Sequence, residues 1–229
     1  MQLTIEDRIA GAELALKEGR IIQGAWRRKS DDGRELVCAL AAFGPEINDA
    51  SKCPADLMPQ WLAQLVPYID DGIAVKEIPW FMGELVSRAS RWQAIEPAGW
   101  ERIRTGFLIM VIRGALEAAE PVQPDPKPAY WQKVVDACNG VIAALEGKGD
   151  LKTARAAAAD ARWAAAAAAA RWAAAAAAAR WAAAAAAADA AARWAAAADA
   201  AAADAAARRT TWRTVAENLF TLIDAELAA

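Results

Sequence analysis

Apolar residues recur at helical spacing along most of this chain. In the first such stretch Ile5, Ile9 and Leu16 fall on one face, with Thr4 before the stretch and Gly19 after it. Because threonine is a common N-cap and glycine a common helix terminator, we predict an amphipathic helix between Thr4 and Gly19. The same spacing predicts further helices over about 58–69, 76–93, 98–120, 129–145 and 212–227.

The stretch 98–120 differs from the other predicted helices because apolar residues surround it on nearly every side. A helix of this kind is usually buried, so we expect it to be the central core helix. The sequence Asp70-Asp71-Gly72 interrupts the apolar pattern earlier in the chain. Because Asp and Gly are frequent turn residues, we predict a turn there.

A small β-hairpin is predicted over 21–38. Two short runs of β-forming residues flank the turn sequence Ser-Asp-Asp-Gly at 30–33. The run 36–43 is equally compatible with a short buried helix that ends at Gly44-Pro45, because periodicity does not separate strand from helix over so few residues.

The predicted fold is therefore mainly α-helical. Residues 1–120 are expected to form a mostly helical globular domain that contains the hairpin. Residues 121–128 include four prolines, too many for a helix or a sheet, and are expected to form a linker. Residues 129–229 form a second helical region, with an alanine-rich segment at 151–208 and an amphipathic helix at 212–227.

The alanine-rich segment is expected to be a long helix or a helical hairpin, because alanine is the best helix former and neither glycine nor proline occurs after position 150. Arg-Trp pairs punctuate it, the first three of them nine residues apart. Nine residues make about 2.5 helical turns, so successive tryptophans lie on opposite faces and both faces are expected to contact a partner. The candidate protein-binding residues are Arg162, Trp163, Arg171, Trp172, Arg180, Trp181, Arg193 and Trp194.

The length and charge of this segment suggest how it pairs. A continuous helix over 151–208 would be about 85 Å long, whereas a compact protein of this size is about 45 Å across. The helix must therefore protrude or fold back. Its first half is mostly basic and its second half mostly acidic, which favours antiparallel pairing with itself or within a hairpin. The alternative is a spacer that arose by expansion of short repeats and has no partner.

Several kinds of chemistry are excluded or unsupported. The sequence has no histidine, which removes Ser-His-Asp and Cys-His nucleophiles and mixed Cys/His zinc sites. Its three cysteines are widely spaced and are expected to be small buried hydrophobic residues. We find no phosphate-binding glycine motif. The pairs Asp31-Asp32 and Asp70-Asp71 each precede glycine, which turn chemistry explains. We therefore predict no catalytic residue, cofactor or metal, and keep a carboxylate- or metal-dependent enzyme as an alternative.

The location and the partners follow from charge and hydropathy. No apolar run is long enough to cross a bilayer, and the odd cysteine count together with a charged N-terminus favours the cytoplasm. The net charge of -3 argues against nucleic acid. One cluster interleaves basic and aromatic residues, as nucleic-acid-binding surfaces do, although such a cluster is more often a solvated, charged strand edge. The cluster consists of Arg20, Trp26, Arg27, Arg28 and Lys29.

Two features resemble proteins seen elsewhere. The Arg/Trp/Ala tract followed by the helix 212–227 resembles C-terminal segments of uncharacterised phage, prophage and immunity-type proteins of GC-rich bacteria. The stretch 53–63 (CPADLMPQWLA), followed by Asp70-Asp71-Gly72 and Ser90-Arg91-Trp92, is similar to N-terminal domains of such proteins. The resemblance implies a mobile-element or toxin–immunity context, in which small proteins often bind and block another protein. It transfers no functional residues.

These observations favour a non-enzymatic protein-binding factor, such as a phage anti-defence inhibitor or an immunity protein. The expected partner is another protein, or a second copy of this protein through antiparallel helix pairing. The second hypothesis is a structural or oligomeric scaffold whose alanine-rich helices pair with themselves.

Overall fold

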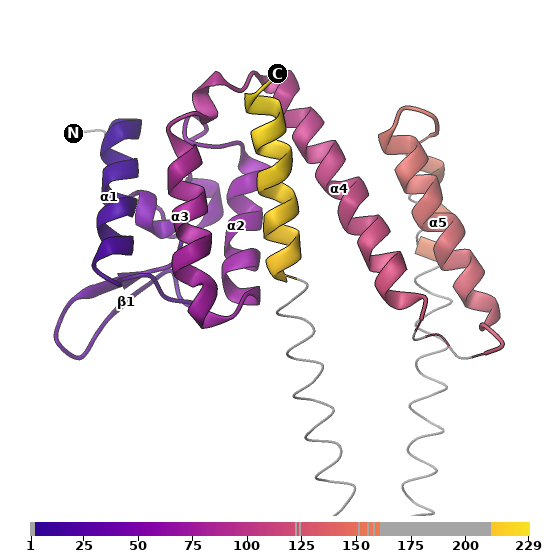
Figure 1. Cartoon of the computed structure of the whole chain (residues 1–229), viewed down its shortest axis with the longest axis horizontal. Coiled ribbons are helices and arrows are strands. Elements are labelled where there is room, and N and C mark those ends of the chain that lie inside the picture. Colours follow the sequence, from indigo (N-terminus) through magenta and orange to yellow (C-terminus); the bar gives the residue numbers. More distant parts are fainter. Residues whose placement is uncertain are drawn as a thin grey trace, which may run out of the picture. The chain divides into compact units, whose positions relative to one another are not determined.

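The computed structural model describes residues 3–121, 123, 125–150, 152–154, 156, 157, 159, 160 and 212–229. The protein divides into two compact units, of which the first combines Met1–Ile103 with Asp204–Ala229 and the second is Arg104–Ala203. The described residues are mainly helical and include one two-stranded antiparallel sheet (Figure 1). The predicted fold class is thus confirmed.

The first helix, α1, spans Ile5–Lys17, as the capping signals predict. The hydroxyl oxygen of Thr4 accepts a hydrogen bond from the backbone N–H of Asp7 at 3.1 Å, and the Asp7 carboxylate accepts one from the Thr4 N–H at 3.0 Å. This reciprocal pair is a capping box, which satisfies two backbone donors that the helix leaves unpaired. Gly19 ends the helix region in the left-handed conformation, with φ of 64°.

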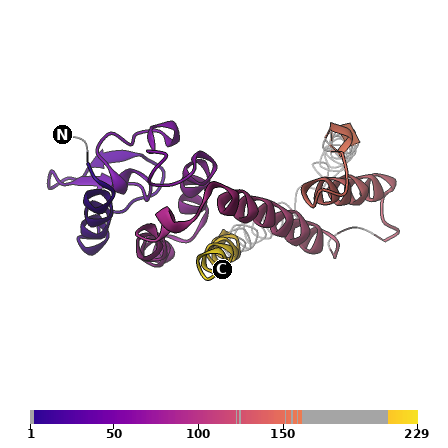
Figure 2. The ribbon, with the colours of Figure 1, turned by 90° about the horizontal axis from the view of Figure 1, so that it is seen from above.

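The predicted hairpin is also confirmed. Strand β1 (Arg27–Lys29) pairs antiparallel with β2 (Glu35–Val37), and Arg27 lies opposite Val37. The two strands lie beside α1 (Figures 1 and 2). The run 36–43 combines both predicted alternatives, because it begins in β2 and ends in a short 3₁₀ helix, η1, over Ala41–Phe43.

The core of the first unit lies between α2 (Gln60–Gly72), α3 (Ile78–Ala89) and the C-terminal helix at 212–227. Each of these three helices, and the segment after β2, contributes fully buried side chains. The short 3₁₀ helices are η2 (Ala50–Lys52), η3 (Val75–Glu77) and η4 (Trp92–Ala94). The buried residues include Leu40, Phe43, Leu62, Val66, Ile69, Phe81, Met82, Leu85, Leu219 and Ile223.

The turn predicted at Asp70-Asp71-Gly72 is wrong, because α2 continues through these residues. Their side chains are held by distant segments instead of capping a local turn. The carboxylate of Asp70 accepts a hydrogen bond from the N–H of Ala39, and that of Asp71 accepts one from the N–H of Gly24. Tertiary contacts therefore override the local preference of Asp for turns.

The C-terminal helix packs against α3 through an aromatic cluster and an ion pair. The ring of Phe220 lies 5.9 Å from that of Phe81 and 6.0 Å from that of Trp80. Arg88 donates to both carboxylate oxygens of Asp224, at 2.9 and 2.7 Å, and its guanidinium lies 4.7 Å from the centre of the Phe220 ring. The C-terminal helix (yellow in Figure 1) thus belongs to the same compact unit as the N-terminal residues and completes its core.

Replacing Gly72 with alanine is expected to lower the free energy of unfolding by about 1–3 kcal/mol, because overpacking forces neighbouring groups to shift. A Cβ atom at this position would overlap the indole ring of Trp212. Urea unfolding of Gly72→Ala, Trp212→Ala and the double variant measures the coupling between the two positions. If the two changes are additive, the close approach of Gly72 and Trp212 is contradicted.

Helix α4 (Pro97–Ala119) is not the central core helix that its composition predicts. Leu108 and Val111 are 38% and 37% exposed, whereas Ile103 and Phe107 are buried. The buried residues of α4 therefore lie in its first half. The central positions in the core are occupied by α2 and α3.

In the second unit, helix α5 (Ala129–Leu145) is amphipathic as predicted. Arg113 of α4 forms an ion pair with Glu146 at 3.1 Å. Gly147 ends α5 with φ of 74°. The N–H of Thr153 then donates to the carboxylate of Asp150 at 2.8 Å, which caps the next helical residues. The described residues of 121–128 lie between α4 and α5, outside helix and strand.

Candidate binding site at an arginine-lined hollow

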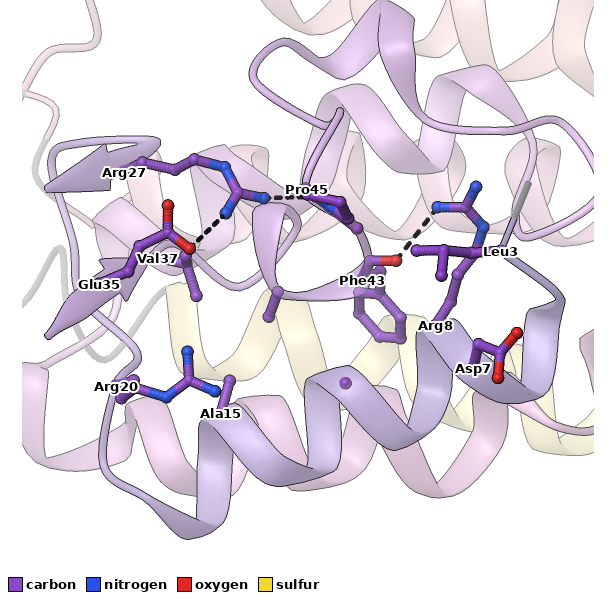
Figure 3. Close-up of a pocket in the computed structure, with 13 residues that line it drawn as sticks. Leu3, Asp7, Arg8, Ala15, Arg20, Arg27, Glu35, Val37, Phe43 and Pro45 are labelled. Carbon is purple, nitrogen blue, oxygen red and sulfur yellow. Dashed lines mark hydrogen bonds and ion pairs between the residues drawn. The ribbon is translucent and has the colours of Figure 1, made fainter. Parts of the chain in front are cut away.

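The Arg-Trp pairs that the sequence offers as binding residues lie outside the described residues, so they stay predictions. Within the described residues, a hollow of about 180 Å³ opens in the first unit between α1, the hairpin and η1 (Figure 3). Apolar side groups and three arginines line it. Its lining includes Leu3, Asp7, Arg8, Ala15, Arg20, Arg27, Glu35, Val37, Ala42, Phe43 and Pro45.

Arg8 forms one wall of the hollow and is 5% exposed. It projects from the buried face of α1, and its guanidinium donates to the carbonyl oxygen of Phe43 at 3.2 Å. The same guanidinium forms an ion pair with Glu46 at 2.5 Å. A cation near the end of a helix stabilises carbonyls that the helix leaves unpaired. Arg8 therefore acts as a structural clamp on the end of η1.

Arg27 has a similar role on the opposite wall. It is the first residue of β1, and its guanidinium donates to the carbonyl oxygen of Ala41 at 2.7 Å and to that of Gly44. The same group pairs with Glu35 across the hairpin at 3.1 Å. Two arginines from separate elements thus hold the η1 segment against α1 and the sheet.

Arg20 differs because its backbone is fixed while the end of its side chain is not engaged. Its N–H donates to the carbonyl of Ala15 at 2.9 Å, and its own carbonyl accepts from the N–H of Val37 at 2.9 Å. Its Nε pairs with Glu18 at 2.6 Å. The two terminal nitrogens have no hydrogen-bond partner among the residues that the structure describes, and Figure 3 shows this guanidinium reaching into the hollow near Ala15 and Val37.

The charges around the hollow are nearly balanced. Each guanidinium has one glutamate partner, which is Glu46 for Arg8, Glu18 for Arg20 and Glu35 for Arg27. These glutamates are all about half exposed, whereas the arginines are mostly buried. Because the arginines are less exposed than their glutamate partners, the hollow is lined mainly by hydrogen-bond donors of these pairs.

The acidic pair Asp70-Asp71 does not form a shared site. Asp70 is fully buried and accepts from the N–H of Ala39 at 3.3 Å, while the exposed Asp71 accepts from the N–H of Gly24 at 2.8 Å. Burial is the largest cause that raises the pKa of Asp70, to about 7. The two carboxylates therefore lie in different surroundings, one buried and one exposed.

The cysteines behave largely as expected. Cys38 and Cys53 are buried, as predicted, and Cys138 is half-buried. Burial raises the pKa of the Cys53 thiol to about 12 and raises that of Cys38. Such thiols stay protonated and are poor nucleophiles near neutral pH. Among the described residues, no group of three or more His, Cys, Asp or Glu residues is arranged to hold a metal ion.

Sequence reasoning singled out Arg20 and Arg27 within the basic cluster but missed Arg8. The missed signal is the phase of α1, whose buried positions are Arg8, Ala12 and Ala15, spaced by four and three residues. The larger apolar residues Ile5 and Ile9 are only half-buried. An arginine on the same helix face as two alanines indicates a narrow, closely packed face with a buried cation.

Comparison with protein-family models, curated proteins and solved structures finds no match to this protein. In the part of the sequence that the structure describes, no helix has the length and apolar character that a membrane span requires.

Proposed function

We propose that this protein is a non-enzymatic protein-binding factor that acts in the cytoplasm by blocking a partner, as a phage anti-defence inhibitor or an immunity protein does. The observation that carries the proposal is the end of Arg20, which has no partner among the described residues and lies in a hollow lined by apolar and charged side chains. Arginine is among the residues that most often dominate binding energy at protein interfaces.

The rigidity of the hollow supports this function. Backbone hydrogen bonds of the N–H and the carbonyl of Arg20 fix its Cα, and Arg8 and Arg27 hold the η1 segment in place. A preformed site loses less conformational entropy when it binds a partner than a flexible one does. Leu3, Ala42 and Pro45 of the lining keep exposed apolar surface that binding would remove from water.

Affinity capture from the cells in which the protein acts tests the proposal. The full-length protein with Arg20→Glu is expected to retain at most about a tenth of the partner that the unmodified protein captures, because a buried charge pair at an interface contributes about 2 kcal/mol or more. Arg28→Glu makes the same charge change at an exposed neighbouring position outside the hollow and is expected to capture normally. Equal capture by both variants contradicts the role of the hollow.

A second comparison tests whether the alanine-rich segment also contacts the partner. A variant with alanine at all four tryptophans of the Arg-Trp pairs is expected to lose part of the captured material, because tryptophan contributes large apolar area at interfaces. An unchanged partner list restricts the binding surface to the hollow. The four positions are Trp163, Trp172, Trp181 and Trp194.

A further inference from the structure

The end of the Arg20 side chain is a planar pair of donors. Its Nε is occupied by Glu18 at 2.6 Å, which leaves the two terminal nitrogens as a fork (Figure 3). Such a fork matches the two oxygens of a carboxylate, with two parallel N–H···O bonds. The other two guanidiniums donate to backbone carbonyls of the η1 segment and form the walls instead.

The charge balance selects a monoanion. The three guanidiniums face Glu18, Glu35 and Glu46, and Asp7 adds a further carboxylate to the lining. A phosphate would bring nearly two negative charges to this site, beside four carboxylates. A single carboxylate adds less repulsion while it still uses both donors of the fork.

We infer that the hollow binds a single carboxylate group, held end-on by Arg20. This inference rests on the proposed function and names the chemical group of the partner that contacts the hollow. The carboxylate belongs either to an acidic residue or to the C-terminus of a polypeptide, because both offer the same planar pair of oxygens.

Titration of the isolated full-length protein with small blocked amino acids separates these sources. N-acetyl-aspartate N-methylamide presents the carboxylate of an acidic residue, N-acetyl-alanine presents a terminal one, and N-acetyl-asparagine N-methylamide is the neutral isostere. The readout is the ¹⁵N–¹H signal of the Arg20 Nε–H, assigned by its loss in Arg20→Gln. At least one carboxylate is expected to shift this signal saturably, and the one that binds more tightly identifies the source.

Matched variants separate binding at Arg20 from general ionic effects. In Arg20→Gln, followed through the backbone N–H signal of Val37, the carboxylate is expected to bind at least about tenfold more weakly. Glu18→Gln removes a carboxylate that partly neutralises Arg20 and repels a second carboxylate, and is expected to tighten binding about twofold to fivefold. A gain of affinity cannot arise from misfolding. Arg28→Gln is expected to bind as the unmodified protein does.

Three results overturn the inference: no saturable shift with either carboxylate, equal binding of the neutral isostere, or tighter binding of inorganic phosphate. These results are distinguishable from failure of the proposed function. If capture of a partner depends on Arg20 but no carboxylate binds, the protein-binding function stands and its chemistry is different. If carboxylates bind but Arg20→Glu and Arg28→Glu capture the same proteins in equal amounts, the hollow is a small-molecule site and its proposed role in protein binding fails.

Discussion

Replacing Asp70 with asparagine is expected to remove most of the dependence of the free energy of unfolding on pH between about pH 4 and pH 7. Asp70 is fully buried at the end of α2. Burial raises the pKa of its carboxyl from 3.8 to about 7, the N–H of Ala39 opposes this change, and the nearby charge of Asp71 adds to it. Asp70 therefore keeps its proton in the folded state well above the pH at which the unfolded state releases it.

The sign of the pH dependence follows from the order in which the unfolded and the folded state release this proton. Below about pH 4 both states are protonated, and Asp70 has no effect on the pH dependence. As the pH rises to about 7, the unfolded state loses the proton first, so stability falls by about 1.4 kcal/mol per pH unit, or about 4 kcal/mol in total. Above about pH 7 the loss is complete and constant.

Urea unfolding of the unmodified protein and of Asp70→Asn across this pH range measures the difference. The asparagine variant is expected to show a nearly flat profile and to be the more stable of the two at pH values above the raised pKa of Asp70. Asp31→Asn is the control, because this exposed carboxylate in the hairpin turn is not among the groups that shift the pKa of Asp70, and its removal should leave the slope intact. A slope in Asp70→Asn equal to that of the unmodified protein contradicts burial of this carboxyl.

Replacing Phe220 with alanine is expected to lower the free energy of unfolding by about 3–5 kcal/mol, the usual cost of removing a buried aromatic ring. Phe220 is 3% exposed, and its ring lies against Phe81, Trp80 and Arg88. The variant would leave a cavity at the point where the C-terminal helix meets α3, and would remove the ring over which Arg88 lies.

Denaturant titrations followed by tryptophan fluorescence measure this effect. The neighbouring Thr221→Ala changes an exposed residue of the same helix and is expected to alter stability by no more than about 0.5 kcal/mol. If Phe220→Ala is no less stable than Thr221→Ala, the C-terminal helix does not belong to the core of the first unit.

The local features of the fold were predictable from the sequence because they depend on near neighbours. The capping box of Thr4 and Asp7, the terminating glycines and the Ser-Asp-Asp-Gly turn each involve residues within a few positions of one another. Periodicity located the helices to within a few residues for the same reason. The hairpin was predicted from the same kind of local signal.

The errors arose where distant segments decide the outcome. Asp70 and Asp71 lie in a helix because the N–H groups of Ala39 and Gly24 bind their carboxylates. Composition did not reveal that Leu108 of α4 is exposed, since the apolar character of a helix does not specify which other segments pack against it. No local pattern connects residues as far apart as Arg88 and Asp224 either.

The candidate site was only partly predictable. Arg20 and Arg27 appeared in the sequence as parts of one basic cluster, whereas the structure gives them different roles. The difference depends on η1, whose carbonyls bind Arg8 and Arg27 but not Arg20. Only the folded protein shows that, among the described residues, both terminal nitrogens of Arg20 lack a partner, whereas those of Arg27 are engaged and its buried Nε is not.

The most direct test of the central claim is the dissociation constant of the captured partner for Glu18→Gln, compared with that for the unmodified protein. Glu18 follows α1 and partly neutralises the guanidinium of Arg20 through the ion pair at 2.6 Å. If Arg20 holds a carboxylate of the partner, removal of this negative charge tightens binding, about twofold to fivefold. An unchanged or weaker affinity would contradict the assignment of Arg20 as the contact.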